Sequence, residues 1–161
     1  MQLISVLVAC AAAVSAVEIK KTAASADQVA FLQKYSSEEG AVVMPSGMMY
    51  KEIKAGAGGS PGPGTSCSCH YEGRTAASYP SGPTFDSSYE RGKPASFAPS
   101  QVIKAWTEAM QMMKVGSKWE IVCPPEVAYG SRAMGAKIPA NSVLVFTMEM
   151  LACPGIASSD L

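Results

Sequence analysis

The chain has 161 residues, of which 48% are hydrophobic and 16% charged, a composition typical of one globular domain with a modest extension. Thirteen Lys and Arg residues balance thirteen Asp and Glu residues. Because the net charge is zero, the composition gives no indication of binding to nucleic acid or to an anionic membrane. Neither is therefore expected as a partner.

The first sixteen residues form an apolar run that ends in small residues and is too short to span a bilayer. This pattern predicts a signal peptide over residues 1–16, cleaved after Ala16. Two alternatives remain: lipidation at Cys10, because Leu7-Val8-Ala9-Cys10 is similar to a lipoprotein processing site, and a retained N-terminus. No second apolar run of membrane length follows, so we expect no membrane contact after cleavage. An exported compartment is expected: the endoplasmic reticulum lumen, the periplasm, the thylakoid lumen or the cell exterior.

One of the five cysteines lies in the expected leader. The others are Cys67, Cys69, Cys123 and Cys153. In an exported chain, four cysteines permit up to two disulfides with three possible pairings. However, their spacing is unlike a disulfide framework, and the domain is large enough to form a core without one. The residues alone therefore favour buried free thiols, with disulfides as the alternative.

Residues 17–43 predict an N-terminal extension with a short helix over residues 22–37. Its apolar positions on one side are Val29, Leu32 and Tyr35, a narrow helical stripe. Ser25 and Gln28 are spaced as in a capping box, in which the two side chains bond reciprocally to the first-turn amides. We expect this helix to pack on the domain or on a partner.

The rest of the chain predicts strands over residues 48–54, 65–74, 118–123 and 143–151, with a short apolar piece around Phe97. Between them, residues 100–113 carry apolar side chains at 102, 103, 106, 109, 110 and 113, the spacing of a one-sided helix. Ser100 is its expected N-cap. One helix among strands buries its stripe against a sheet, so the fold class is α+β.

A glycine-rich loop over residues 55–64 is followed by a strand rather than by a helix, which argues against a phosphate site. The single histidine, His70, follows Cys67 and Cys69. On a strand these thiols and the imidazole face opposite sides. A zinc site would need further ligands, and a hydrolase would need the histidine beside a nucleophile. No metal and no cofactor are therefore expected.

Several short motifs lie within residues 44–153, and most of them contain an aromatic residue. The motifs are His70-Tyr71-Glu72-Gly73, Phe85-Asp86-Ser87-Ser88, Arg91, Val102-Ile103-Lys104-Ala105-Trp106, Ala128-Tyr129-Gly130, Ile138-Pro139 and Leu144-Val145-Phe146. In this order they resemble the FKBP-type peptidyl-prolyl cis/trans isomerases. The Mip (macrophage infectivity potentiator) branch of this family is similar at three further stretches: Pro45-Ser46-Gly47, residues 94–103 and Trp106-Thr107-Glu108-Ala109. Ala105 departs from the pattern, because a glycine is usual before the tryptophan.

The resemblance implies a five-stranded antiparallel, twisted sheet wrapped around one central helix, with the active site between helix and sheet. It implies four catalytic residues: Asp86, Tyr129, Tyr71 and Phe85. It also implies a substrate-binding set: Trp106, Phe97, Val102, Ile103, Arg91, Ile138 and Phe146. As the floor of an open pocket, Trp106 is expected to be partly exposed. In the family arrangement the strand with Cys67 lies beside the last strand, so the resemblance also permits a Cys67–Cys153 bridge.

By this resemblance the chain is an isomerase that accelerates rotation of X-Pro bonds in exported clients. Proline-containing polypeptides and macrolide inhibitors of the rapamycin type are the expected partners. The alternative is an FKBP-fold chaperone or docking module with little isomerase activity. The expected organisation is a signal peptide (1–16), an N-terminal extension (17–43), an isomerase domain (44–153) and a C-terminal tail (154–161). The helix of the extension is short, so a monomer is expected.

Overall fold

The computed structural model describes residues 19–157, and the expected signal peptide lies outside the described residues. The helices are α1 (Ala26–Ser36) and α2 (Lys104–Met112), with short 3-10 helices η1 (Pro99–Gln101) and η2 (Pro125–Val127). The strands are β1 (Val42–Val43), β2 (Met49–Lys54), β3 (Cys67–Thr75), β4 (Asp86–Ser87), β5 (Ala95–Phe97), β6 (Lys118–Cys123) and β7 (Leu144–Ala152).

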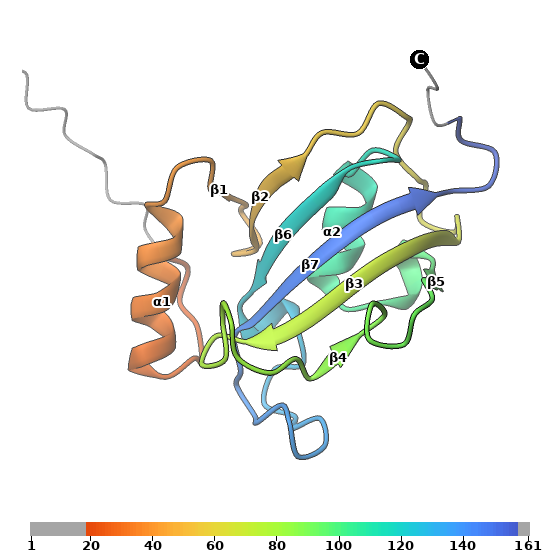
Figure 1. The fold of residues 1–161 in the computed structure, drawn as a ribbon. Coiled ribbons are helices and arrows are strands. Elements are labelled where there is room, and N and C mark those ends of the chain that lie inside the picture. The colour runs from red at the N-terminus through yellow and green to blue at the C-terminus, as the bar shows by residue number, and fades with distance from the viewer. Residues whose placement is uncertain (1–18, 158–161) are drawn as a thin grey trace, which may run out of the picture.

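The strands form one antiparallel sheet in the order β1-β2-β6-β7-β3-β4, and β5 also pairs with β3. Figure 1 shows α2 on one face of this twisted sheet and α1 beside the other. The expected α+β fold around a central helix is confirmed. The described residues contain seven strands rather than five, because two-residue pairings at β1 and β4 extend the sheet at its edges.

The inner core lies between α2 and the sheet. Alternate residues of β3, such as Cys69 and Tyr71, point inward, whereas His70 points outward. From α2, the side chains of Ala105, Ala109 and Met110 are buried against them. The apolar stripe expected on this helix is therefore confirmed as a core-facing surface.

The start of this helix differs from the prediction. Ser100 belongs to η1, and α2 begins at Lys104 after two extended residues, Val102 and Ile103. The Thr107 hydroxyl donates to the Pro99 carbonyl at 2.6 Å, which holds η1 against the first turn of α2. Two adjacent β-branched residues favour the extended backbone, so the helix is interrupted where the sequence pattern continues.

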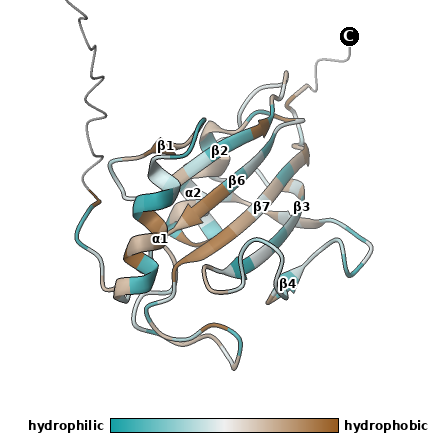
Figure 2. Cartoon of the chain, turned by 60° about the vertical axis from the view of Figure 1, so that its left-hand side comes forward, coloured by the Kyte–Doolittle hydropathy of each residue, from teal (hydrophilic) through white to brown (hydrophobic). Residues whose placement is uncertain are grey.

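The outer face of the sheet carries a second, smaller core under α1. Leu32 and Tyr35 pack with Val122, Val143 and Val145, and Figure 2 shows hydrophobic stretches of β6 and β7 where α1 lies over the sheet. The helix therefore packs on its own domain, which is one of the two expected possibilities.

The expected capping box at the start of α1 is wrong. Ser25 is the N-cap, but its side chain makes no capping hydrogen bond. The Gln28 side-chain oxygen instead accepts a hydrogen bond from the backbone N–H of Val143. The Gln28 side chain thus makes a tertiary contact with Val143 instead of the expected local capping bond.

A disulfide joins Cys67 to Cys153, while Cys69 and Cys123 are buried free thiols. The expectation of free thiols is therefore correct for one pair and wrong for the other. Pairing of β3 with β7 sets Ser68 opposite Ala152, and this register places the preceding and following cysteines together. The bridge permitted by the family arrangement is present.

Candidate functional site

A pocket of about 480 Å³ lies at one end of α2, between this helix and β3, β5 and β7. Most of its lining is aromatic or aliphatic, with a few polar groups. The lining residues are Tyr71, Phe85, Asp86, Phe97, Gln101, Val102, Ile103, Trp106, Tyr129 and Phe146. An apolar concavity with few convergent polar groups is how small-ligand and peptide sites are built.

Trp106, on the first turn of α2, forms the base of this pocket. Its ring makes edge-to-face contacts with Tyr71, Phe97 and Phe146, with centroids 5.2, 5.2 and 5.0 Å away. These contacts leave the residue only 5% exposed, so the expectation of partial exposure is wrong. The ring nevertheless lines the pocket.

A hydrogen-bonded triad of Asp86, Tyr71 and Arg91 borders the pocket. The Tyr71 hydroxyl donates to Asp86 Oδ2, Arg91 pairs with Asp86 Oδ1, and Arg91 also donates to the Tyr71 oxygen at 2.9 Å. Burial raises the pKa of Asp86, but the hydrogen bonds from Tyr71 and Arg91 outweigh it, so the pKa lies below its usual value. Burial, then the bond to Asp86, raises the pKa of Tyr71. The triad therefore presents an ionised carboxylate and a neutral phenol.

Phe85 closes one side of the pocket because Gly73 leaves room for it. The Phe85 and Phe146 rings meet edge to face at 5.5 Å. A Cβ at Gly73 would lie 2.5 Å from Phe85 and 2.7 Å from Phe146. Gly73 of β3 pairs with Asp86 of β4, so this close approach also sets the adjacent carboxylate.

Tyr129 enters the pocket from the loop that follows η2. It is half-buried, and burial raises the pKa of its phenol. Gly130, directly after it, has a φ of 58°, a left-handed conformation that glycine adopts without strain. Tyr129 therefore adds a neutral phenol, a hydrogen-bond donor, to the lining of the pocket.

All the site residues expected from the resemblance line this pocket except two. Arg91 reaches it only through Asp86 and Tyr71, and Ile138 is a buried core residue at 6% exposure. One lining residue, Gln101, was missed. The periodic pattern placed it inside a helix, whereas it ends η1 at the rim of the pocket.

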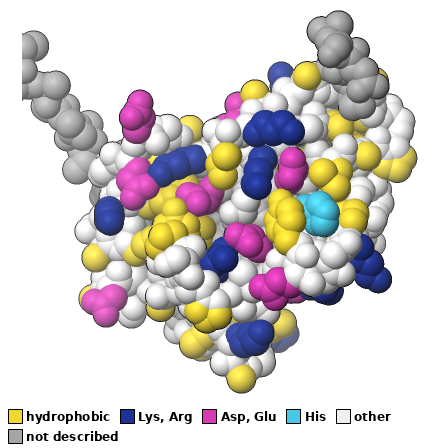
Figure 3. Space-filling model, in the orientation of Figure 1, with side chains coloured by type: hydrophobic (Ala, Val, Ile, Leu, Met, Phe, Trp, Pro, Cys, Tyr) yellow, Lys and Arg dark blue, Asp and Glu magenta, His cyan; other side chains and the backbone are white. Residues whose placement is uncertain are grey.

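His70 lies away from this site on the outer face of the sheet, where Figure 3 shows the imidazole. It stacks on Tyr89 at 4.6 Å, and its Nδ1 lies 2.9 Å from the Ser88 hydroxyl. In residues 19–157, no three His, Cys, Asp or Glu side chains gather as metal ligands. Within the same residues, no helix is long and apolar enough to cross a membrane.

Known proteins are similar to this chain in sequence and in fold. It is 43% identical over 122 residues to the outer membrane protein MIP of Legionella longbeachae, covering 76% of this chain and 51% of that protein. It is 40% identical over 122 residues to the macrophage infectivity potentiator of Trypanosoma cruzi, covering 75% and 60%. The chain thus spans about half to three fifths of these relatives.

Solved structures match the fold as well. The crystal structure of FkpA from Escherichia coli superposes with a TM-score of 0.73 at 36% identity, covering 80% of this chain and 58% of that one. A peptidyl-prolyl cis-trans isomerase from Pseudomonas syringae superposes with a TM-score of 0.70 at 31% identity, covering 79% and 90%. The FKBP_C family model, described as FKBP-type peptidyl-prolyl cis-trans isomerase, matches residues 58–151. The chain therefore belongs to the FKBP-type peptidyl-prolyl cis-trans isomerase family.

Proposed function

We propose that this protein is a peptidyl-prolyl isomerase that accelerates rotation about X-Pro bonds in polypeptide clients. The observation that supports it best is the pocket on Trp106, in which an aromatic enclosure carries one hydrogen-bonded carboxylate, Asp86. The description of the matching family and the name of the similar Pseudomonas syringae protein support the same activity. Residues 44–153 are the proposed isomerase domain.

The chemistry requires no covalent step. A planar amide resists rotation by about 18–20 kcal/mol because of its conjugation. At the twisted midpoint the conjugation is lost and the amide is less dipolar, so an apolar enclosure disfavours the planar form relative to the twisted one. A thousandfold acceleration needs only about 4 kcal/mol. Exclusion of water and one or two hydrogen bonds are sufficient for that.

The proposed roles follow from position in the pocket. The proline ring lies on Trp106, between side walls formed by the neighbouring aromatic and aliphatic residues. The Tyr129 hydroxyl holds the substrate carbonyl during rotation. Asp86, oriented by Tyr71 and Arg91, provides the polar edge. The walls are Tyr71, Phe85, Phe97, Val102, Ile103 and Phe146.

The proposed setting is an exported compartment, which the apolar leader and the Cys67–Cys153 disulfide support, because disulfides persist in oxidising environments. Proline-containing clients and macrolides of the rapamycin type are the proposed ligands. The protein is proposed to act as a monomer.

The test is proline-limited refolding of a model protein with wild type, Asp86→Ala and Tyr129→Phe, each with and without rapamycin. Wild type is expected to accelerate the slow phase, and rapamycin is expected to abolish the acceleration. Both variants are expected to lose about tenfold or more in kcat/KM, the effect of about 1.4 kcal/mol on the barrier. Folded wild type that prevents aggregation without accelerating the slow phase would contradict the proposal and support the chaperone reading.

A further inference from the structure

The N-terminal extension lies on the opposite side of the sheet from the pocket, yet it contacts two of the segments that carry pocket residues. The first segment, residues 76–85, leads from β3 to Phe85 and Asp86. Within it, Tyr79 packs edge to face on Phe31 of α1, with ring centroids 5.7 Å apart. The helix therefore supports the loop that delivers one wall of the pocket.

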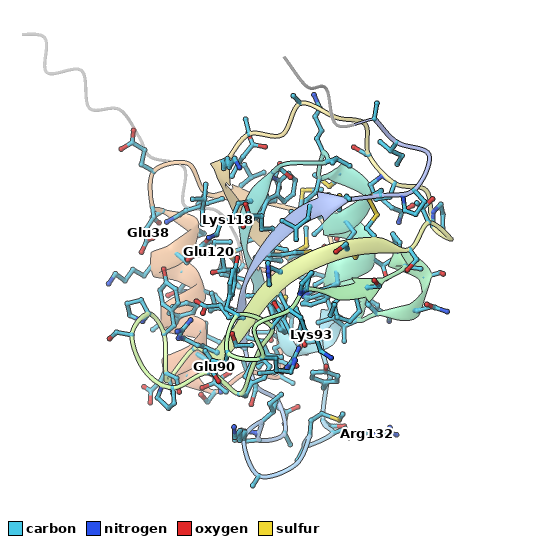
Figure 4. All side chains as sticks on the ribbon, turned by 45° about the vertical axis from the view of Figure 1, so that its right-hand side comes forward. Glu38, Glu90, Lys93, Lys118, Glu120 and Arg132 are labelled. Atoms are coloured by element: carbon cyan, nitrogen blue, oxygen red, sulfur yellow. A yellow bond between two sulfur atoms is a disulfide. The ribbon has the colours of Figure 1, made fainter. Side chains whose placement is uncertain are left out.

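Glu120 also links the Tyr79 loop to α1. This side chain of β6 accepts hydrogen bonds from the Tyr35 hydroxyl at 2.9 Å and from the Tyr79 hydroxyl at 3.1 Å. Burial, followed by the nearby Glu120, raises the pKa of both phenols, that of Tyr79 to about 12, so they remain donors at neutral pH. Figure 4 shows Glu120 on the part of the sheet beside α1, near Glu38.

The second segment, residues 126–143, carries Tyr129 and is held at both ends. At its start, Glu126 of η2 accepts hydrogen bonds from the Thr22 hydroxyl at 2.9 Å and the Ala23 N–H at 2.5 Å. At its end, the Val143 N–H donates to the Gln28 side chain. Residues 22–28 thus hold both ends of the segment that carries Tyr129.

We propose that residues 22–36 are a positioning element for the pocket, which rests on the proposed function. They hold the Tyr79 loop and the Glu126–Val143 segment so that Phe85 and Tyr129 face Trp106 before a client binds. Side chains that are already ordered lose less conformational freedom on binding. Loss of this support weakens substrate binding while leaving the barrier of bound substrate nearly unchanged.

The test uses the full chain with three variants. Tyr79→Phe keeps the ring on Phe31 and removes the hydroxyl bonded to Glu120. Glu126→Ala removes the acceptor for residues 22 and 23. Gln33→Ala, on the exposed side of α1, is the matched control. Kinetics are measured with proline peptides, amide hydrogen exchange is followed over residues 76–85 and 126–142, and circular dichroism verifies folding.

Tyr79→Phe and Glu126→Ala are each expected to raise KM by about fivefold, the equivalent of one neutral hydrogen bond of about 1 kcal/mol. Their kcat is expected to stay within about twofold, and exchange is expected to quicken in the segment that each variant releases. The control is expected to match wild type. If Glu126→Ala does not fold, a further variant, Gln28→Ala, decides, because it removes the acceptor of the Val143 N–H within residues 22–36.

Faster exchange without a rise in KM would overturn the proposal, as would an equal rise in the Gln33→Ala control. Unchanged exchange in folded Tyr79→Phe and Glu126→Ala would also overturn it. Failure of the proposed function is recognised separately, because wild type itself would then show no isomerase activity. In that case the dissociation constant of rapamycin, followed by Trp106 fluorescence, replaces KM, and no change in it for either variant overturns the positioning role.

Discussion

Asp86 accepts hydrogen bonds from a phenol and a guanidinium, which keep its carboxylate ionised and fixed at the edge of an apolar cavity. A charge-assisted bond of this kind is roughly twice as strong as a neutral one. Both Asp86 and Arg91 are 43% exposed at the side chain, so solvent reduces what their ion pair contributes to folding stability. Its main effect is to orient the carboxylate and the Tyr71 ring.

The pH profile tests this arrangement. The pKa of Asp86 is below its usual value and that of Tyr71 is above its own, so neither titrates between about pH 5 and 9. We therefore expect kcat/KM for proline peptides to be flat over that range. Because the pKa of Asp86 is lower in the folded state than in the unfolded state, where it is about 3.9, this carboxylate stabilises the fold at pH values above about 3.9. That contribution is lost as the pH falls through the folded-state pKa. A limb between pH 5 and 9 that disappears in Asp86→Asn would contradict the assignment.

Gly73→Ala tests the packing behind the pocket wall. The added methyl would lie 2.5 Å from Phe85 and 2.7 Å from Phe146, so one ring must move. We expect rapamycin affinity to fall by about tenfold or more, and stability to fall by about 1–3 kcal/mol through overpacking. Trp106 fluorescence and urea denaturation measure the two effects. Gly64→Ala is the control, because nothing lies within 4 Å of its Cβ; the same loss there would refute the explanation.

The residues of the pocket were predictable because motifs with fixed spacing name them, and Tyr71, Asp86 and Trp106 do lie together. Gln101 was not, since neither its composition nor its spacing distinguishes it from a helix residue. The exposure of Trp106 was also misjudged. How closely three rings pack around an indole depends on strands distant in sequence, which local pattern does not describe.

At the scale of elements, hydrophobic periodicity predicted the long strands and α2 well, because each buries one continuous face. It failed at the starts of the two helices. At α2, the extended pair Val102-Ile103 interrupts the helix and the Thr107 bond to Pro99 spans the interruption. At α1, the Gln28 bond to Val143 replaces the expected cap. Contacts between residues far apart in the chain decide such boundaries, as they also decide β1 and β4.

The end of β7 is joined to the start of β3 by the Cys67–Cys153 disulfide, across a sequence separation of 86 residues. Closing a loop of this length is expected to stabilise the fold by about 2–4 kcal/mol. Cys67→Ala/Cys153→Ala is therefore expected to show a lower urea midpoint, and reduced wild type should match it. Thiol titration of unfolded, unreduced chain cleaved after Ala16 should find the thiols of Cys69 and Cys123 alone. Four free thiols would contradict the disulfide.

At the scale of the whole molecule, the sheet separates two cores. The inner one, around α2, opens into the pocket, and the outer one is closed by α1. The sequence predicted the inner core because the family motifs cover it. It predicted α1 but not the surface on which this helix packs. The packing of its narrow apolar stripe on Val122 and Val145 depends on the tertiary arrangement of β6 and β7.

Because the side chains of Leu32 and Tyr35 are buried against the sheet of their own chain, α1 has little apolar surface left for contact with a second copy. We expect a monomer in sedimentation velocity at micromolar concentration. Leu32→Ala, which removes a fully buried side chain, should loosen α1 without changing the sedimentation coefficient to that of a dimer. A wild-type dimer that this variant dissociates would show instead that α1 forms an interface between copies.

The edges of the sheet have a consequence for the proposed activity on incompletely folded chains. β1 and β4 have two residues each and β5 three, and β1 pairs with only two of the six residues of β2. The part of β2 beyond β1 carries Lys51 and Lys54, and lysine side chains on an edge strand disfavour the addition of another strand. Under the proposed function, an unfolded client is expected to bind at the concave aromatic site rather than by adding a strand to the sheet. We therefore expect that the protein does not become a template for the aggregation of such clients.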